Sequence, residues 1–344
     1  MFRPAHRYLI LLLAVITTPS PSAETGFAGD WMIELHSADA PITGLLQLEK
    51  SAAGWQGYVE GGPVDVTIAG KAIEVRVDSR DLSGFVFYRV LRGTLDDGKL
   101  VGHFTIERER ASTEREGTWT GVRKSPQQPI DDPQPVDLSG IWTPARGVDF
   151  RKYSMDLTPQ AEEWHGNYLM HYDQPNVRCA SVGIAAMVAW GAYPFEILET
   201  PGRLTFLYEV DSEVRRIYLD GTPQPEYYPP SDMGYSNAYW DGSELVIETV
   251  NLAANVRDFR GEPISDGASM LERYWLGDDG KTLNAVIELH DPVNYRRPPI
   301  RRRMWTRNPE TRIYPYECDP ESFYRQMYDE GRMDMYFERA DRRN

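Results

Sequence analysis

The chain has 344 residues, of which 41% are hydrophobic and 12% aromatic. This length fits two domains, and the hydrophobic share is large enough to build a core, so a chain that is disordered throughout is excluded. The formal net charge of −15 opposes binding to nucleic acid and to anionic membrane surfaces. We therefore expect no nucleic-acid partner.

Residues 1–23 have the pattern of a secretory signal peptide. A basic start precedes an apolar run over residues 8–16, and cleavage is expected after Ser22 or Ala23. A membrane anchor is the alternative, but this run is too short to span a bilayer, and no later stretch is long and apolar enough. The sequence predicts a periplasmic or secreted protein without stable membrane insertion.

The chain contains two cysteines, Cys179 and Cys318. In an exported chain, exactly this number favours one disulfide, because the compartment supplies the oxidant. Such a bond would close a loop of 139 residues. The chain-entropy model values that closure at roughly 4 to 5 kcal/mol. Two separate buried thiols are the alternative.

A proline-rich stretch, "KSPQQPIDDPQPVD" at residues 124–137, predicts an extended linker. It separates a smaller part, residues 24–123, from a larger part, residues 138–320. The first part alternates apolar and polar residues in short runs between turn residues, which is typical of an all-β barrel or sandwich. Residues 321–344 form a charged tail that we expect to be helical.

The larger part is also mainly β, with two irregular inserts. Thr158 followed by Pro159 predicts the start of a helix, with Thr158 as the N-cap. That helix is expected to pack on a barrel or to cover its mouth. The apolar stretch over residues 179–197 is expected to be a buried loop.

Each part begins with the same short motif. Gly29-Asp30-Trp31 opens the first, and "GIW" at residues 140–142 opens the second. A Gly-x-Trp motif followed by many short strands resembles the opening of lipocalin-like (calycin) barrels, in which the tryptophan plugs one end. The resemblance implies an all-β fold of two tandem lipocalin-like antiparallel β-barrels.

The larger part also resembles a widespread group of exported bacterial proteins. The resemblance lies in "PFEILETPGRLTFLYEVDSEVRRIYLDG", "YWDGSELVIETVNL", "LERYWLGDDGKTL", "HDPVNY" and the late Cys318. Similar chains usually have Gly-x-Ser-x-Gly-x-Trp where this one has "GYSNAYW", and Gly-x-Pro where it has "GIAAM". Both departures fall in expected mouth loops, so the ligand is expected to differ. The resemblance transfers no catalytic residue.

Several predicted strands carry ionisable side chains among apolar neighbours, and the hairpin at residues 206–221 has charge on both faces. These faces either point into one polar barrel lumen or face water, as the outer face of an antiparallel strand commonly does. We favour the lumen. The residues expected there are Arg216, Tyr218, Asp220, Glu248, Glu272, Tyr274, His290 and Arg303.

This arrangement predicts acid–base chemistry. Carboxylates in apolar surroundings have a raised pKa, so Glu248 and Glu272 are the expected acid and base, assisted by His290. Arg216 is expected to hold an anionic or carbonyl group of the substrate, and Tyr218, Asp220, Tyr274 and Arg303 complete the binding set. No metal or cofactor is expected, because the chain lacks metal-ligand spacings, a phosphate loop and a dinucleotide fingerprint.

The exception to the acidic composition is "RRPPIRRR" at residues 296–303. A basic run can mark an anionic partner. We instead expect these to be strand residues paired with the surplus carboxylates.

Fold analogy and the polar strands favour an exported, cofactor-independent lyase, isomerase or cyclase acting on a hydrophobic or aromatic small molecule in the second barrel. The alternative is a non-catalytic periplasmic protein that binds an amphipathic small molecule. A third hypothesis is a structural envelope protein, which a barrel core filled by Trp and Tyr would favour. Fold alone does not decide among them.

Overall fold

The computed structural model describes most of the chain outside the predicted signal peptide, namely residues 25–38, 41–80, 86–107, 116–124, 132–145, 149–150 and 152–341. The predicted signal peptide and half of the predicted linker, residues 125–131, lie outside these ranges. Within them, no helix has the length and apolarity needed to cross a membrane.

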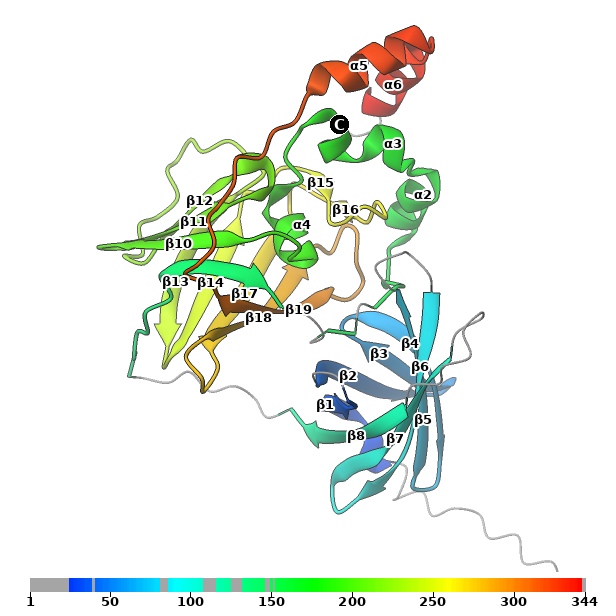
Figure 1. The fold of residues 1–344 in the computed structure, drawn as a ribbon. Helices are drawn as coiled ribbons and strands as arrows, with labels where there is room; N and C mark the ends of the chain where they lie inside the picture. Colours follow the sequence, from blue (N-terminus) through cyan, green and yellow to red (C-terminus); the bar gives the residue numbers. More distant parts are fainter. Residues whose placement is uncertain are drawn as a thin grey trace, which may run out of the picture.

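The first β-barrel follows a short 3-10 helix, η1 (Thr25–Phe27), and is closed because β1 pairs with both β2 and β8. Its apolar side chains alternate with exposed ones, so one face of each strand fills the interior. Figure 1 shows this barrel below the second one. The strands are β1 (Gly29–His36), β2 (Ile42–Ser51), β3 (Gly54–Val59), β4 (Gly62–Ala69), β5 (Ala72–Arg80), β6 (Val86–Asp96), β7 (Lys99–Glu107) and β8 (Glu116–Arg123).

The second β-barrel is closed by β9, which pairs with both β10 and β19. A separate two-stranded sheet, β15 with β16, lies outside it. The elements are β9 (Gly140–Pro144), β10 (Phe195–Thr200), β11 (Arg203–Tyr208), β12 (Val214–Tyr218), β13 (Tyr235–Asp241), β14 (Glu244–Val250), β15 (Asn255–Val256), β16 (Pro263–Ile264), β17 (Ser269–Leu276), β18 (Thr282–His290) and β19 (Ile300–Arg307).

The predicted all-β fold with two tandem barrels is confirmed. The expectation of purely antiparallel pairing is wrong at one place, because β12 and β13 are parallel, with Ile217 opposite Ser236. A parallel pair needs a crossover connection of a dozen or more residues. Residues 219–234 provide it.

Both Gly-x-Trp motifs close their barrels in the same way. Trp31 and Trp142 are fully buried, and each indole N–H donates to the carbonyl of the residue four positions earlier. An arginine from the last strand lies over each indole ring, Arg123 over Trp31 and Arg307 over Trp142, with 4.4 Å and 4.6 Å between guanidinium carbon and ring centroid. The repeated motif therefore marks the same buried tryptophan, indole hydrogen bond and arginine contact in both barrels.

The helices gather around the mouth of the second barrel. They are α2 (Pro159–Asn167), α3 (Met170–Asp173), η2 (Pro175–Arg178), α4 (Gly183–Trp190) and η3 (Val210–Ser212). Thr158 is the N-cap of α2, as predicted. The expected buried loop over residues 179–197 is wrong, because residues 183–190 form α4. This short apolar helix is buried on every side, so its sequence lacks the periodicity that would reveal it.

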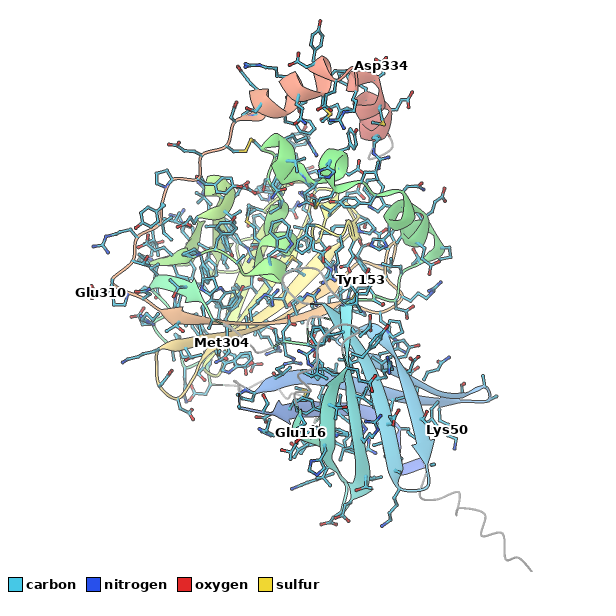
Figure 2. All side chains as sticks on the ribbon, turned by 45° about the vertical axis from the view of Figure 1, so that its right-hand side comes forward. Lys50, Glu116, Tyr153, Met304, Glu310 and Asp334 are labelled. Carbon is cyan, nitrogen blue, oxygen red and sulfur yellow. A yellow bond between two sulfur atoms is a disulfide. The ribbon has the colours of Figure 1, made fainter. Side chains whose placement is uncertain are left out.

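The C-terminal segment is tied back to the second barrel. From β19 it runs past β10–β12 to helices α5 (Pro320–Asp329) and α6 (Met333–Asp341), which lie against η2 and α3 (Figure 1). The predicted disulfide between Cys179 and Cys318 is confirmed, and Figure 2 shows it as a yellow bond below α5. We call α5 and α6 the C-terminal cap. Its own core is small: Phe323, Met327 and Tyr336 pack on Tyr172.

The segment that follows β9 closes the open end of the first barrel. Phe150 is fully buried and belongs to the first barrel's core. Its carbonyl oxygen accepts hydrogen bonds of 2.8 Å from Ser79 Oγ and from Arg89 Nη1. Lys152, also fully buried, is ion-paired with Asp78. Side chains from the segment after β9, the first strand of the second barrel, thus complete the packing of the first barrel.

The second barrel also receives a contact from the first. Glu60 lies between β3 and β4. Its carboxylate accepts a hydrogen bond of 3.1 Å from Arg302 Nε, and its backbone carbonyl accepts one of 3.0 Å from the Ile300 N–H. Gly61 packs against the segment just before β19. A Cβ at this position would lie 2.1 Å from the Pro298 carbonyl oxygen. Only glycine fits, because its φ of +82° is also left-handed. Each barrel therefore contributes residues that contact the other: Phe150 enters the first barrel, and Glu60 contacts β19 of the second.

We predict that Phe150→Ala lowers the free energy of unfolding by about 3 to 5 kcal/mol, because it empties a site inside the first barrel. Urea unfolding followed by tryptophan fluorescence measures this. The control is Tyr227→Ala, whose side chain is 91% exposed and which should change stability little. A loss below about 1 kcal/mol for Phe150→Ala would contradict the packing described.

Candidate functional site

A buried ion pair occupies the interior of the second barrel. Arg215 of β12 and Glu272 of β17 are 1% and 0% exposed, and both nitrogens of the guanidinium fork donate to the carboxylate. Strands β12 and β17 are separated in the sheet by β13 and β14, so the pair spans the lumen. A charge pair at such depth is tolerated only when the remaining donors and acceptors are also satisfied.

Neighbouring side chains satisfy this pair. Arg215 donates a hydrogen bond of 3.1 Å from Nε to Ser236 Oγ and one of 2.6 Å from Nη2 to Thr249 Oγ1. The Tyr274 hydroxyl donates a hydrogen bond of 2.8 Å to Glu272 Oε1. Burial, together with the Glu272 charge, holds the pKa of Tyr274 well above its usual range. Both ions are therefore engaged by fixed protein groups.

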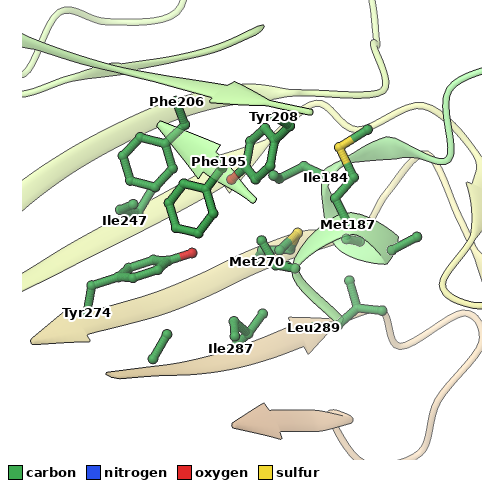
Figure 3. Packing of buried hydrophobic residues seen from close by; sticks show 14 of the residues in the cluster. Ile184, Met187, Phe195, Phe206, Tyr208, Ile247, Met270, Tyr274, Ile287 and Leu289 are labelled. Carbon is green, nitrogen blue, oxygen red and sulfur yellow. The ribbon is translucent and has the colours of Figure 1, made fainter. Parts of the chain in front are cut away.

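Aromatic and aliphatic side chains fill the rest of the lumen. Figure 3 shows Tyr208 and Tyr274 packed with Phe195 and Phe206, with Met187 of α4 nearby. The space left between α4 and these rings is about 10 Å³, enough for about one water molecule. This space beside α4 is therefore too small for a small-molecule substrate.

Three residues expected in the lumen do lie on the inner side. Glu272 and Tyr274 belong to the network above. Arg303 lies at the mouth, where its Nε donates 3.0 Å to the Val188 carbonyl of α4 and its Nη1 donates 2.8 Å to Asp149. Arg303 therefore anchors α4 and the segment that leads to the first barrel.

The lumen placement is wrong for the other predicted residues. Glu248 and Arg216 are exposed, because the inward positions of their strands are taken by Ile247, Thr249, Arg215 and Ile217. Tyr218 lies on the same outer face as Arg216 and stacks on Tyr235, with 5.3 Å between ring centroids. Asp220 is exposed and accepts from the Thr222 backbone N–H and hydroxyl, which lowers its pKa.

His290 also lies outside the barrel. Leu289 and Ile287 point inward, so His290 and Glu288 share the outer face of β18, with 3.5 Å between Nε2 and the carboxylate. Their hydrogen bond raises the pKa of His290 and lowers that of Glu288. The residues expected to act as one acid–base set are thus divided between two faces of the sheet.

A much larger cavity lies outside the lumen, next to α4. Its volume is about 740 Å³, within the range of ordinary ligand sites. Its walls come from α2, η2, the β15–β16 sheet, the loop after β18 and α6 of the C-terminal cap. Apolar surface is supplied by Trp164, Val256, Ile264 and Tyr336, and polar surface by a group that includes Arg178, Ser181, Asp232, Asn255 and Asn294.

The polar wall is anchored by Asp232. Asn255 Nδ2 donates 2.9 Å to Asp232 Oδ1 and 3.2 Å to the Ser181 carbonyl. Burial raises the pKa of Asp232, while the Asn255 hydrogen bond and the Arg178 charge oppose that rise. The wall can therefore offer a ligand both a carboxylate and a guanidinium.

Two further carboxylates lie behind this wall. Asp211 accepts 3.1 Å from the Val182 N–H, just before α4. Burial, with the charge of Asp232, raises the pKa of both Asp211 and Glu213. In the described part of the chain, no three His, Cys, Asp or Glu side chains are arranged to hold a metal ion.

The sequence interpretation missed the two sites' central residues. Arg215 and Arg216 are adjacent, and the buried Ile217 two residues after Arg215 was the signal that selects Arg215 as the inward one. Asp232 and Asn255 lie in segments without periodicity, and their proximity depends on the crossover and on β15. No spacing in the sequence indicates that contact.

No family model and no curated protein matches the chain. Solved structures do match, and they include the following two, which align over most of its length. One is a protein of unknown function from the DUF3598 family of Nostoc punctiforme PCC 73102, with 9% identity, a TM-score of 0.25, and coverage of 83% of this chain and 97% of that one. The other is described as a "putative outer membrane protein" from Bacteroides fragilis NCTC 9343, with 12% identity, a TM-score of 0.25, and coverage of 84% and 100%. At these values neither informs function.

We predict that Glu272→Gln lowers the free energy of unfolding by about 3 to 5 kcal/mol, because it leaves the Arg215 charge buried without its counterion. Chemical denaturation measures the loss. Glu248→Gln, an exposed position on the adjacent strand, is the matched control and should cost less than about 0.5 kcal/mol. Equal effects at the two positions would contradict the inward placement of Glu272.

We predict that the pKa of His290, followed by NMR, lies above its ordinary value of 6.5 and that Glu288→Gln brings it back. A raised folded-state pKa means that the imidazolium stabilises the protein below the unfolded pKa, and that this contribution is lost as pH rises through the folded pKa. The effect on stability is small, because the imidazole is 44% exposed. A pKa that Glu288→Gln leaves unchanged would rule out the pair.

Proposed function

We propose that this protein is an exported, non-catalytic binding protein for an amphipathic small molecule, and that its site is the 740 Å³ cavity beside α4. The observation that supports this most is the contrast in volume between that cavity and the space between α4 and the aromatic rings of the lumen, which is about 10 Å³. A drug-sized ligand needs a cavity of about 300 to 1,000 Å³. This cavity meets that requirement, and it favours binding over the purely structural role that the aromatic filling of the barrel would otherwise support.

The chemistry of the walls indicates what the ligand looks like. An apolar body would lie against Trp164, Val256 and Ile264, since such surfaces gain from excluding water. A polar end would reach Asp232 and Arg178, where a donor and an acceptor can both be satisfied. An amphipathic molecule with a hydrogen-bonding head therefore fits better than a hydrocarbon or a polyanion.

The C-terminal cap is part of this site. Tyr336 of α6 forms part of the cavity wall, and Arg339 is ion-paired with Asp173 in another part of that wall. The Cys179–Cys318 disulfide fixes the start of the cap beside η2. Because a cap with so small a core gains much of its order from this bond, an oxidising compartment suits the proposed site.

Catalysis by a lyase, isomerase or cyclase mechanism has weaker support. Such a mechanism needs an acid and a base near one substrate atom. Glu272 is saturated by Arg215 and Tyr274, while Glu248 and His290 lie on the outer face. We therefore favour binding without turnover, in the periplasm or outside the cell, for a member of the exported group that the sequence resembles.

The proposal predicts that filling the cavity abolishes binding. Ala254 lies on the cavity wall and is exposed, so Ala254→Trp should place an indole in the cavity without disturbing the core. We expect it to weaken binding of N-phenyl-1-naphthylamine, a neutral amphipathic fluorophore, by about tenfold or more. Fluorescence titration of the mature protein measures the change.

The matched control is Ala52→Trp, on the exposed β2–β3 turn of the first barrel, which should bind as the wild type does. A fragment screen by ligand-observed NMR, repeated on both variants, extends the test to natural-like ligands. If Ala254→Trp and Ala52→Trp bind equally, the cavity is not the site. Turnover of any fragment by the wild type would overturn the non-catalytic assignment.

A further inference from the structure

The basic run at residues 296–303 is mostly neutralised, as the sequence predicted. Arg296 is ion-paired with Asp156, and Arg297 with Glu49. The other described ion pairs of the run join Arg302 to Glu60 and Arg303 to Asp149. Among the described residues, Arg301 alone of the five arginines in this run forms no ion pair.

Arg301 is nevertheless buried. It lies on β19 opposite Ile287, and it is 9% exposed. Its guanidinium donates to no described residue, whereas its neighbours on the strand each donate to a carboxylate. A buried charge without a counterion is unfavourable, so this position calls for a partner.

The surroundings of Arg301 are themselves cationic. Arg257 and Arg260, from the loop between β15 and β16, act on it electrostatically, and burial with these two charges lowers its pKa to about 10. Glu262 and Asp149 oppose that change. Glu262 is already shared by Arg257 and Arg260, and Asp149 is bonded to Arg303.

The charges of this cluster do not balance. Its five arginines are Arg257, Arg260, Arg301, Arg302 and Arg303, and the described carboxylates that meet them are those of Glu60, Asp149, Asp258 and Glu262. Glu288 also acts electrostatically on Arg302, but among these described arginines Arg301 is the one that is ion-paired with no carboxylate. Arg257 Nε is also buried without a hydrogen-bond partner.

We propose that the guanidinium of Arg301 binds a small oxyanion, of the sulfate, phosphate or formate class, at the mouth of the second barrel where it meets the first. A planar guanidinium fork matches the oxygens of such ions better than a halide does. Arg257, whose Nε is buried without a hydrogen-bond partner, adds a second positive charge from the loop between β15 and β16. The anion would complete the charge balance of the cluster that joins the barrels, independently of the cavity beside α4.

The test is thermal unfolding of the mature protein in sodium sulfate and, separately, in sodium formate, each balanced with sodium chloride to constant ionic strength. Binding to the native state raises Tm with the logarithm of anion concentration. We expect a saturable rise at millimolar anion in the wild type and none in Arg301→Met. A rise in Tm with formate but not with sulfate would indicate a site for a planar monovalent anion. A rise with sulfate but not with formate would indicate a site for a tetrahedral anion, and either result supports the proposal.

The direction of the stability change caused by Arg301→Met in anion-free buffer is a second criterion. Arg301→Met should then be as stable as the wild type or more stable, because it removes an uncompensated buried charge. Arg203→Met, at an exposed position on β11, controls for general loss of positive charge and should keep the wild-type anion response. If wild type and Arg301→Met respond in parallel to both anions, the proposal is wrong.

A second measurement does not depend on any variant folding. Crystals of the wild type soaked in sodium selenate should show an anomalous selenium peak beside the Arg301 guanidinium. The absence of that peak from fully soaked crystals, together with a flat sulfate and formate response, would overturn the assignment. Neither result bears on whether the larger cavity binds a small molecule.

Discussion

The ion pair between Arg215 and Glu272 determines what the second barrel can do. It spans the lumen, and Ser236, Thr249 and Tyr274 satisfy its remaining hydrogen-bonding groups. A pair held in this way cannot release its carboxylate for proton transfer without leaving a buried guanidinium uncompensated. Packed aromatic and aliphatic side chains surround this pair in the interior of the barrel.

In the part of the chain that the structure describes, a cavity of ligand size lies outside the sheet. Helix α4 closes the mouth, and the segments that cross above it form the walls of the larger cavity. The disulfide brings the C-terminal cap to the same place, so the last residues of the chain meet residues from its middle. The cavity is thus a product of tertiary structure rather than of any single motif.

The junction between the barrels gives this assembly a fixed frame. Phe150 completes the first core, while Glu60 reaches Arg302 on β19. The same strand carries Arg301 and Arg303 at the mouth. Charge balance at the junction, packing of the first barrel and placement of α4 are therefore linked through one strand.

Much of the fold could be predicted from the sequence, because its signals are local or repeated. The paired Gly-x-Trp motifs, the alternation of the strands, the Thr158 N-cap and the two cysteines each specify one feature. The site could not be predicted in the same way. In "VRRIY", successive side chains point to opposite faces of the strand, so a shift of one residue reverses every assignment. Choosing Arg216 instead of Arg215 as the inward residue therefore places the charge on the wrong face.

The most direct test of the central claim, that ligands bind outside a filled lumen, is fluorine NMR of the protein labelled with 5-fluorotryptophan, titrated with N-phenyl-1-naphthylamine. Trp164 lies on the cavity wall, whereas Trp305 lies in the packed lumen. We expect the Trp164 resonance to shift with saturation and the Trp305 resonance to stay fixed. A saturable shift of Trp305 with Trp164 unchanged would contradict it.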